Sequence, residues 1–144
     1  MPEKTFFLIK PDGVARRLEE EIFDRVEKGG LKIVLRKKTV LTLEQAGNLY
    51  KPHFGKEFYP GLIEFITSGP VIACVVEGEQ AVYYLRNLMG DTDPLKAKPG
   101  TIRGDLREDE VINNHGSIKN LVHGSDSPDS AEREIAIFFK EINL

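Results

Sequence analysis

The segment His123-Gly124-Ser125-Asp126-Ser127 carries the side chains best suited to chemistry in this sequence. A histidine ends a short apolar stretch, a glycine leaves space beside its ring, and polar residues follow at an expected helix start, where anions are favoured. The ordinary pKa of imidazole is about 6.5, so most rings are neutral at neutral pH and offer one nitrogen lone pair as a nucleophile. The other ring nitrogen then needs a partner that fixes its proton, and hence the tautomer.

Glu134 is the candidate for that partner. It lies three residues after Ala131 and four before Phe138, on the inward side of a predicted helix, where a carboxylate is costly without a partner. The alternative is a Glu134 that points to solvent beside a His123 that is only structural. Residue spacing by itself favours this alternative, so the catalytic interpretation needs support from other residues.

Three cations could form an anion site around this histidine. Lys10 ends a predicted strand directly before a turn, Arg86 lies on a predicted helix, and Arg103 lies at the end of a long predicted loop. A single exposed lysine or arginine is usually only a solvated surface group. Three around one site would contribute on the order of 5–9 kcal/mol gross, at roughly 1.5–3 kcal/mol for each charged hydrogen bond. That sum is comparable with the ~8 kcal/mol of micromolar binding before association costs.

Composition narrows the class of protein. The formal net charge of −3 argues against binding nucleic acid through its phosphates, so any anion site must be a local cluster of cations. The one cysteine, Cys74, lies in an apolar run and is expected to be a buried core thiol. Neither a secretory leader nor an apolar run of about 18 residues is visible, which predicts a soluble cytoplasmic protein with no membrane segment. The sequence also lacks P-loop, Gly-x-Gly-x-x-Gly, His-Glu-x-x-His and paired-cysteine motifs.

Hydrophobic periodicity predicts a single domain over residues 1–144 in which strands and helices alternate. Strands are expected at 5–9, 31–36, 71–76 and 120–123, and helices at 18–28, 42–53, 61–67, 80–89 and from 127 onward. Residues 90–104 show no periodicity and are expected to form a long loop. This order best fits an α+β fold, a ferredoxin-like βαββαβ sandwich with an antiparallel sheet and added helices.

Four sequence motifs are specific when they are taken together. They are Phe7-Leu8-Ile9-Lys10-Pro11-Asp12-Gly13-Val14, Ser68-Gly69-Pro70-Val71, Lys98-Pro99-Gly100-Thr101-Ile102-Arg103-Gly104-Asp105, and Asn120-Leu121-Val122-His123-Gly124-Ser125-Asp126-Ser127 with Ser130-Ala131-Glu132 after it. Their content and order resemble those of nucleoside diphosphate kinases, from near Lys4 to near Phe139. The resemblance implies an enzyme that transfers the γ-phosphoryl group of a nucleoside triphosphate, mainly ATP, to a nucleoside diphosphate.

The resemblance also implies a role for each matching residue. His123 would be the phosphorylated nucleophile, through its Nδ1 atom, with Glu134 holding the ring and Ser125 in the same network. Phe58 would stack on one face of the base and Leu62 would support that wall; stacking is indifferent to base identity, which implies broad nucleotide specificity. The residues implied to bind phosphates or ribose hydroxyls are Lys10, Tyr50, Arg86, Thr92, Arg103 and Asn120.

The implied mechanism is ping-pong. The γ-phosphoryl group passes in line to His123, the diphosphate leaves, and an acceptor diphosphate takes its place before the transfer reverses. Mg²⁺ would arrive on the nucleotide phosphates rather than in a metal site of the protein, and would help Lys10, Arg86 and Arg103 stabilise charge on the phosphoryl oxygens. The alternative is a non-catalytic nucleotide-binding or regulatory oligomer of the same fold.

The segment 106–119 departs from the family pattern, because it is several residues longer than usual and begins with an acidic run. It contains His115-Gly116-Ser117, a near copy of the signature. We expect His115 not to be the nucleophile, because Asn113-Asn114 rather than an apolar strand precedes it. The longer segment is expected to modulate nucleotide access or packing between subunits.

The sequence leaves two features of the protein undetermined. The residue that faces Phe58 across the base is not identified, with Ser117 and Ile118 as candidates. The chain ends at Leu144, short of the tail that contacts a neighbouring subunit in many members of the family. A homo-oligomer is nevertheless expected, although its size and the preferred base do not follow from the sequence.

Overall fold

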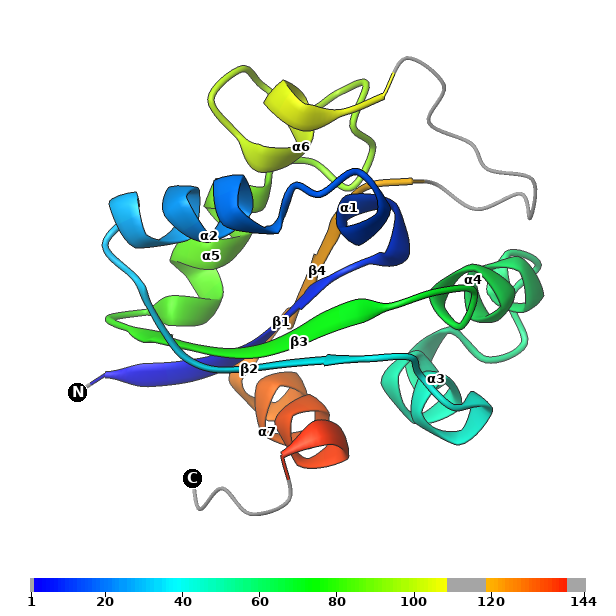
Figure 1. The fold of residues 1–144 in the computed structure, drawn as a ribbon. Helices are drawn as coiled ribbons and strands as arrows, with labels where there is room; N and C mark the ends of the chain where they lie inside the picture. Colours follow the sequence, from blue (N-terminus) through cyan, green and yellow to red (C-terminus); the bar gives the residue numbers. More distant parts are fainter. Residues whose placement is uncertain (1, 109–118, 140–144) are drawn as a thin grey trace.

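A four-stranded antiparallel sheet, in the order β2-β3-β1-β4, forms the centre of the computed structural model (Figure 1). The structure describes residues 2–108 and 119–139. The strands are β1 (Glu3–Ile9), β2 (Lys32–Thr39), β3 (Val71–Gly78) and β4 (Val122–Gly124). The helices are α1 (Pro11–Ala15), α2 (Glu19–Lys28), α3 (Leu43–Leu49), α4 (Tyr59–Ile66), α5 (Ala81–Met89), α6 (Ile102–Leu106) and α7 (Pro128–Phe138), with a 3₁₀ turn at Lys51–His53.

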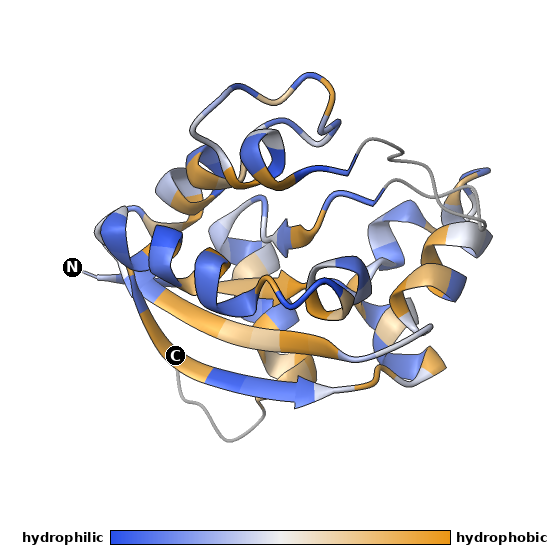
Figure 2. Cartoon of the chain, turned by 45° about the horizontal axis from the view of Figure 1, so that its top comes forward, coloured by the Kyte–Doolittle hydropathy of each residue, from blue (hydrophilic) through white to orange (hydrophobic). Residues whose placement is uncertain are grey.

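Helices cover both faces of the sheet, so the central strand β1 is buried on both sides. Phe7 and Ile9 pack in one layer with residues of α2 and α5, whereas Phe6 and Leu8 pack in the other with residues of α3, α4 and α7. Successive side chains of a strand point to opposite faces, so a continuous apolar run is what a strand buried in this way requires. Figure 2 shows this as hydrophobic colour along the central strands and hydrophilic colour toward the end of β2.

Several helix ends follow the chemistry of the sequence. Thr42 caps α3 in a capping box, in which its hydroxyl accepts from the Gln45 amide and the Gln45 side chain accepts from the Thr42 amide, both at 3.0 Å. Ser127 caps α7 by accepting from the Ser130 amide at 3.1 Å, and Gly29 is the C-cap of α2. The predicted helix start at 127 and the predicted helix end at 28 are confirmed.

Two short helices lie where the sequence predicted irregular chain. Helix α1 begins at Pro11, where a turn was expected, because the fixed φ of proline suits the first helical position. Helix α6 begins at Ile102, inside the predicted loop 90–104, and Thr101 caps it by accepting from the Gly104 amide at 3.0 Å. Each helix has only five residues, which is too few for a helical period to show.

Strand β2 differs from a second expectation at the residues around Ile33 and Leu35. In the predicted strand 31–36, Leu31, Ile33 and Leu35 alternate with their neighbours and would share one face, but the register shifts between Ile33 and Leu35. This irregularity leaves Leu35 39% exposed, while Val34 packs against the opposite layer. The prediction for Cys74 is confirmed, because it is a buried thiol whose pKa is raised to about 12 by burial.

The topology brings two distant parts of the chain to one end of the sheet. β4 pairs with the end of β1, with Leu8 opposite His123 and Ile9 opposite Val122. Lys10 follows directly, and its backbone N–H donates to the Leu121 carbonyl at 2.8 Å. The first and last of the four motifs therefore lie side by side.

Substitution of Gly104, the glycine in α6, tests how tightly this short helix is packed. A Cβ at Gly104 would lie 2.1 Å from the Lys98 carbonyl oxygen, so we expect Gly104→Ala to lower the free energy of unfolding by about 1–3 kcal/mol. Gly47, inside α3, is the matched control, because its nearest neighbour would be 3.7 Å away. Gly47→Ala should raise stability by about 0.5–1 kcal/mol in the same denaturant titration. Equal stability of Gly104→Ala and the wild type would contradict the packing described here.

Candidate active site

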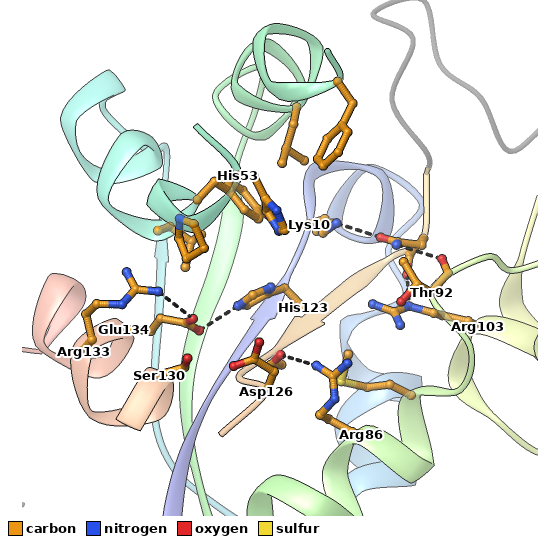
Figure 3. Close-up of a pocket in the computed structure, with 18 residues that line it drawn as sticks. Lys10, His53, Arg86, Thr92, Arg103, His123, Asp126, Ser130, Arg133 and Glu134 are labelled. Atoms are coloured by element: carbon orange, nitrogen blue, oxygen red, sulfur yellow. Dashed lines mark hydrogen bonds and ion pairs between the residues drawn. The ribbon is translucent and has the colours of Figure 1, made fainter. Parts of the chain in front are cut away.

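A cavity of about 700 Å³ opens beside the paired ends of β1 and β4 (Figure 3). Of the residues that the sequence predicted for a site, ten line it: Lys10, Tyr50, Phe58, Leu62, Arg86, Thr92, Arg103, Asn120, His123 and Glu134. Ser125 is fully buried next to this group and donates a hydrogen bond to Glu134. Side chains that are far apart in the sequence are thus gathered around one hollow.

The His123 imidazole is held by a carboxylate. Its Nε2 atom lies 2.8 Å from Oε1 of Glu134, and its side chain is 19% exposed. An ionised carboxylate only accepts, so the geometry puts the ring proton on Nε2 and leaves the Nδ1 lone pair available. The Tyr50 ring meets the imidazole edge-on, with the ring centroids 5.8 Å apart. The ring is thus confined by a hydrogen bond on one side and by an aromatic contact on another.

Glu134 is itself fixed by its neighbours. It is buried on α7, as its spacing predicted, and Ser125 Oγ donates to the same Oε1 at 2.8 Å. Nη2 of Arg133 lies 3.3 Å from the other oxygen, and Nη1 of Arg133 donates to the Asn48 carbonyl at 2.6 Å. Arg133 was not predicted as a site residue, because its partner Asn48 lies on α3, far away in the chain. Each Glu134 oxygen has a partner, so the burial of its charge is compensated.

Lys10 is a buried cation of the cavity whose pKa is strongly lowered. Its Nζ donates to Oδ1 of Asn120 at 2.7 Å, and Nδ2 of Asn120 donates to the Thr92 carbonyl at 3.0 Å. The pKa of Lys10 is lowered to about 8, first by burial and then by the nearby charge of Arg103, while the charge of Asp12 opposes the shift. An ammonium group with so little water around it is well suited to an incoming anion.

The two arginines bind the main chain of the strand that carries His123. Arg103 is buried and donates to the carbonyls of Asn120, Gly90 and Val122 at 3.0, 3.1 and 2.6 Å. Arg86 donates to the Gly124 carbonyl at 3.0 Å. Burial, and then the neighbouring charge of Arg86, lowers the pKa of Arg103 to about 10. Both guanidinium groups are therefore oriented before any ligand arrives.

Tyr50 contributes a hydroxyl that has no partner in the part of the chain that the structure describes. It is 4% exposed and lines the cavity, and burial raises its pKa, with the charge of Glu134 as the second cause. A buried hydroxyl is normally hydrogen-bonded. A polar ligand in the cavity would supply the missing partner.

Sequence reasoning missed several cavity residues. His53, on the 3₁₀ turn, lies between two predicted site residues, with its ring centroid 6.2 Å from that of Tyr50 and 5.3 Å from that of Phe58. Its pKa is lowered, first by burial and then by the charge of Lys56. Asp126 and Ser130 also line the cavity; both belong to the predicted motif around His123, but neither was assigned a role. His53 could have been noticed as one of three histidines, but its helical context suggested no role.

Among residues 2–108 and 119–139, no group of three or more His, Cys, Asp or Glu side chains is placed to hold a metal ion. Within the same residues, no helix has the length and apolar character needed to cross a membrane. His115, Ser117 and Ile118 lie outside the described residues, so the expectations for the segment 106–119 and for the residue facing Phe58 stay predictions.

A histidine with one nitrogen tied to a carboxylate, three cations around it and an exposed aromatic ring at the rim together fit a phosphotransferase that acts on nucleotides. Comparison with known proteins agrees. A family model described as "Nucleoside diphosphate kinase" matches residues 3–144. The chain belongs to the nucleoside diphosphate kinase family.

Individual relatives match over nearly their whole length. A nucleoside diphosphate kinase of Carboxydothermus hydrogenoformans is 51% identical over 142 residues, which is 99% of this chain and 91% of the relative. One of Archaeoglobus fulgidus is 49% identical over 139 residues, covering 96% of this chain and 87% of the relative. Among solved structures, a halophilic nucleoside diphosphate kinase from Halobacterium salinarum in complex with CDP has a TM-score of 0.88 and 46% identity, covering 100% of this chain and 93% of that chain. The predicted family, enzyme class and α+β fold are confirmed.

The tautomer of His123 can be measured directly. We expect ¹⁵N NMR of the neutral ring to show a proton on Nε2 and none on Nδ1, because Glu134 accepts from Nε2 at 2.8 Å. In Glu134→Ala the two tautomers should both be populated, and the Asp129→Ala variant on the exposed side of α7 should leave the spectrum unchanged. A proton on Nδ1 in the wild type would contradict this geometry.

Proposed function

We propose that this chain transfers the γ-phosphoryl group of a nucleoside triphosphate, mainly ATP, to a nucleoside diphosphate through a phosphohistidine at His123. The observation that carries the proposal is the hydrogen bond between Nε2 of His123 and Glu134, in a cavity that also holds three cations. It leaves Nδ1 as the nucleophile. The reaction is ping-pong, because the same pocket receives the donor and then the acceptor.

The first half-reaction needs no general base. Nδ1 carries no proton, so its lone pair forms the P–N bond while the bond from phosphorus to the leaving β-phosphate oxygen breaks and its electrons stay on the diphosphate. The imidazole becomes positively charged, and the buried carboxylate of Glu134 stabilises that charge through Nε2–H. The second half-reaction reverses these changes with an acceptor diphosphate, so both directions use one geometry.

Three cations neutralise the transferring group. Lys10, Arg86 and Arg103 line the cavity, and the buried side chains of Lys10 and Arg103 act where water screens charge poorly. Their hydrogen bonds to Asn120 and to main-chain carbonyls position them before the nucleotide binds. Preorganised charge costs little reorganisation in the transition state, which is why we assign them to catalysis as well as binding.

The nucleotide base is assigned to the rim of the cavity. Phe58 is 49% exposed there, with Leu62 partly buried behind it, so a base can stack on the ring without displacing the core. Stacking does not select one base, which supports broad specificity. Tyr50, Thr92 and Asn120 are assigned to phosphate or ribose oxygens.

We also propose that Mg²⁺ enters with the nucleotide phosphates. The cavity offers Asp126 and the engaged carboxylate of Glu134 beside several cations, a donor set that suits phosphate oxygens better than a bare metal ion. Bound there, Mg²⁺ would supply further charge neutralisation. We further propose a homo-oligomeric, cytoplasmic protein of one domain. Among the described residues, β2 is an edge strand with largely exposed side chains, which supports association through this edge.

A non-catalytic nucleotide-binding oligomer is the competing proposal, and one labelling experiment separates the two. Incubation with γ-³²P-ATP and Mg²⁺ should give an acid-labile phosphate that maps to the peptide containing His123. His123→Ala should lose it, whereas the matched variant His115→Ala should keep the wild-type amount. Nucleotide binding without any labelling would favour the non-catalytic protein, and full labelling of His123→Ala would overturn the assignment.

The pH dependence of transfer should report Lys10. Its pKa is about 8 in the free protein, so the ammonium form that attracts phosphate is present below this value and is lost above it. We expect kcat/KM to fall as the pH rises through about 8. The limb should move by more than one unit to higher pH in Lys10→Arg, because a guanidinium stays protonated. An unchanged limb in that variant would assign the titration to another group.

A further inference from the structure

We propose that Asp12 is a positioning residue, whose carboxylate holds the main chain before His123 in a strained turn and so directs Asn120 and His123 into the cavity. The effect on phosphoryl transfer rests on the proposed function. The structural part of the proposal stands on the contacts of Asp12 alone.

The turn is centred on Leu121. Its φ is +71°, a conformation that is unfavourable for a residue with a bulky side chain. The Val122 amide donates across it to the Asn120 carbonyl at 2.7 Å, which closes a three-residue γ-turn. Strained backbone of this kind persists only where the surrounding structure enforces it. Here the strained residue lies between Asn120, whose side chain lines the cavity, and the nucleophile His123.

The β1–α1 junction bonds both main-chain polar groups of Leu121. Oδ2 of Asp12 accepts from the Leu121 amide at 3.0 Å, and the Lys10 amide donates to the Leu121 carbonyl at 2.8 Å. Arg103 bonds the carbonyls on either side, at Asn120 and Val122. The junction therefore fixes the strained residue itself, while Arg103 fixes its two neighbours.

Burial of the Asp12 carboxylate carries a desolvation cost. Asp12 is 8% exposed, and its Oδ1 has no hydrogen-bond partner among the described residues. Burial raises its pKa, and the charge of Lys10 opposes that shift. An acidic residue in the first turn of a helix can interact with the helix dipole while it stays exposed to solvent. A role in α1 alone therefore does not explain why Asp12 is buried facing Leu121. The buried carboxylate is instead explained by the amide it bonds.

The test compares Asp12→Ala with Asp12→Asn. The alanine variant loses the acceptor, and we expect His123 phosphorylation by ATP in a single turnover to slow on the order of 10²-fold, as misplacement of a reacting group by about 1 Å can do. The asparagine variant keeps a carbonyl oxygen for the Leu121 amide and should recover most of the rate. Val26→Ala controls for lost stability, because Val26 lies in the same hydrophobic layer as Leu121 but does not line the cavity.

Two measurements do not depend on activity. In the wild type, the Leu121 amide should be strongly protected from hydrogen exchange, which can be read even if Asp12→Ala fails to fold. In Asp12→Ala, the ¹⁵N resonances of His123 should broaden or split, while those in Val26→Ala should not. If the wild type forms no phosphohistidine but these two results hold, the proposed function fails and the positioning role stands.

Three outcomes would overturn the positioning role. The Leu121 amide exchanges freely in the wild type; Asp12→Ala phosphorylates His123 as fast as Val26→Ala at equal folded fraction; or Asp12→Asn is as slow as Asp12→Ala. The last result would show that the charge of Asp12, acting on Lys10, matters rather than its hydrogen bond.

Discussion

The site depends on where one proton lies. The bond between Glu134 and Nε2 of His123 keeps that proton away from Nδ1, and without it the ring could rotate or change tautomer. Four features of the structure protect this arrangement. Ser125 and Arg133 hold the carboxylate, the Tyr50 ring confines the imidazole, and the pairing of β4 with β1 fixes the strand that carries it.

Charge is brought into this pocket at a cost to stability. The pKa of Lys10 is about 8 in the folded protein, below its ordinary value, so its charged form opposes folding at neutral pH and this penalty is relieved only as the pH rises above about 8. The pKa of Arg103 is also lowered by burial. Two apolar layers on the faces of the sheet offset these terms, because β1 is buried along most of its length. Burial of apolar side chains thus offsets the cost of desolvating Lys10 and Arg103.

Much of the fold and site could be predicted because local chemistry and periodicity agreed. The caps at Thr42 and Ser127, the buried run at β3 and the inward side of α7 all follow from patterns within a few residues. The grouping of the cations with His123 was different, because spacing along the chain does not bring Lys10 to Asn120. The motif resemblance, rather than periodicity, gave that grouping.

What escaped prediction depends on long-range contacts. The γ-turn at Leu121 has no local signal, since leucine rarely has a positive φ, and it is stabilised by Asp12 from the other end of the chain. Helices α1 and α6 are too short to show a period, and the irregularity in β2 changes which face Leu35 occupies. Arg133 and His53 enter the cavity through tertiary packing with α3 and with Phe58.

The position of the phosphoryl group on the ring tests this account most directly. NMR of the phosphorylated, ¹⁵N-histidine-labelled protein can resolve the ³¹P–¹⁵N coupling to each ring nitrogen of His123. The hydrogen bond to Glu134 predicts phosphate on Nδ1, with the proton retained on Nε2. Phosphate on Nε2 would mean that the ring turns away from Glu134 before it reacts, and would contradict the central role given to that bond.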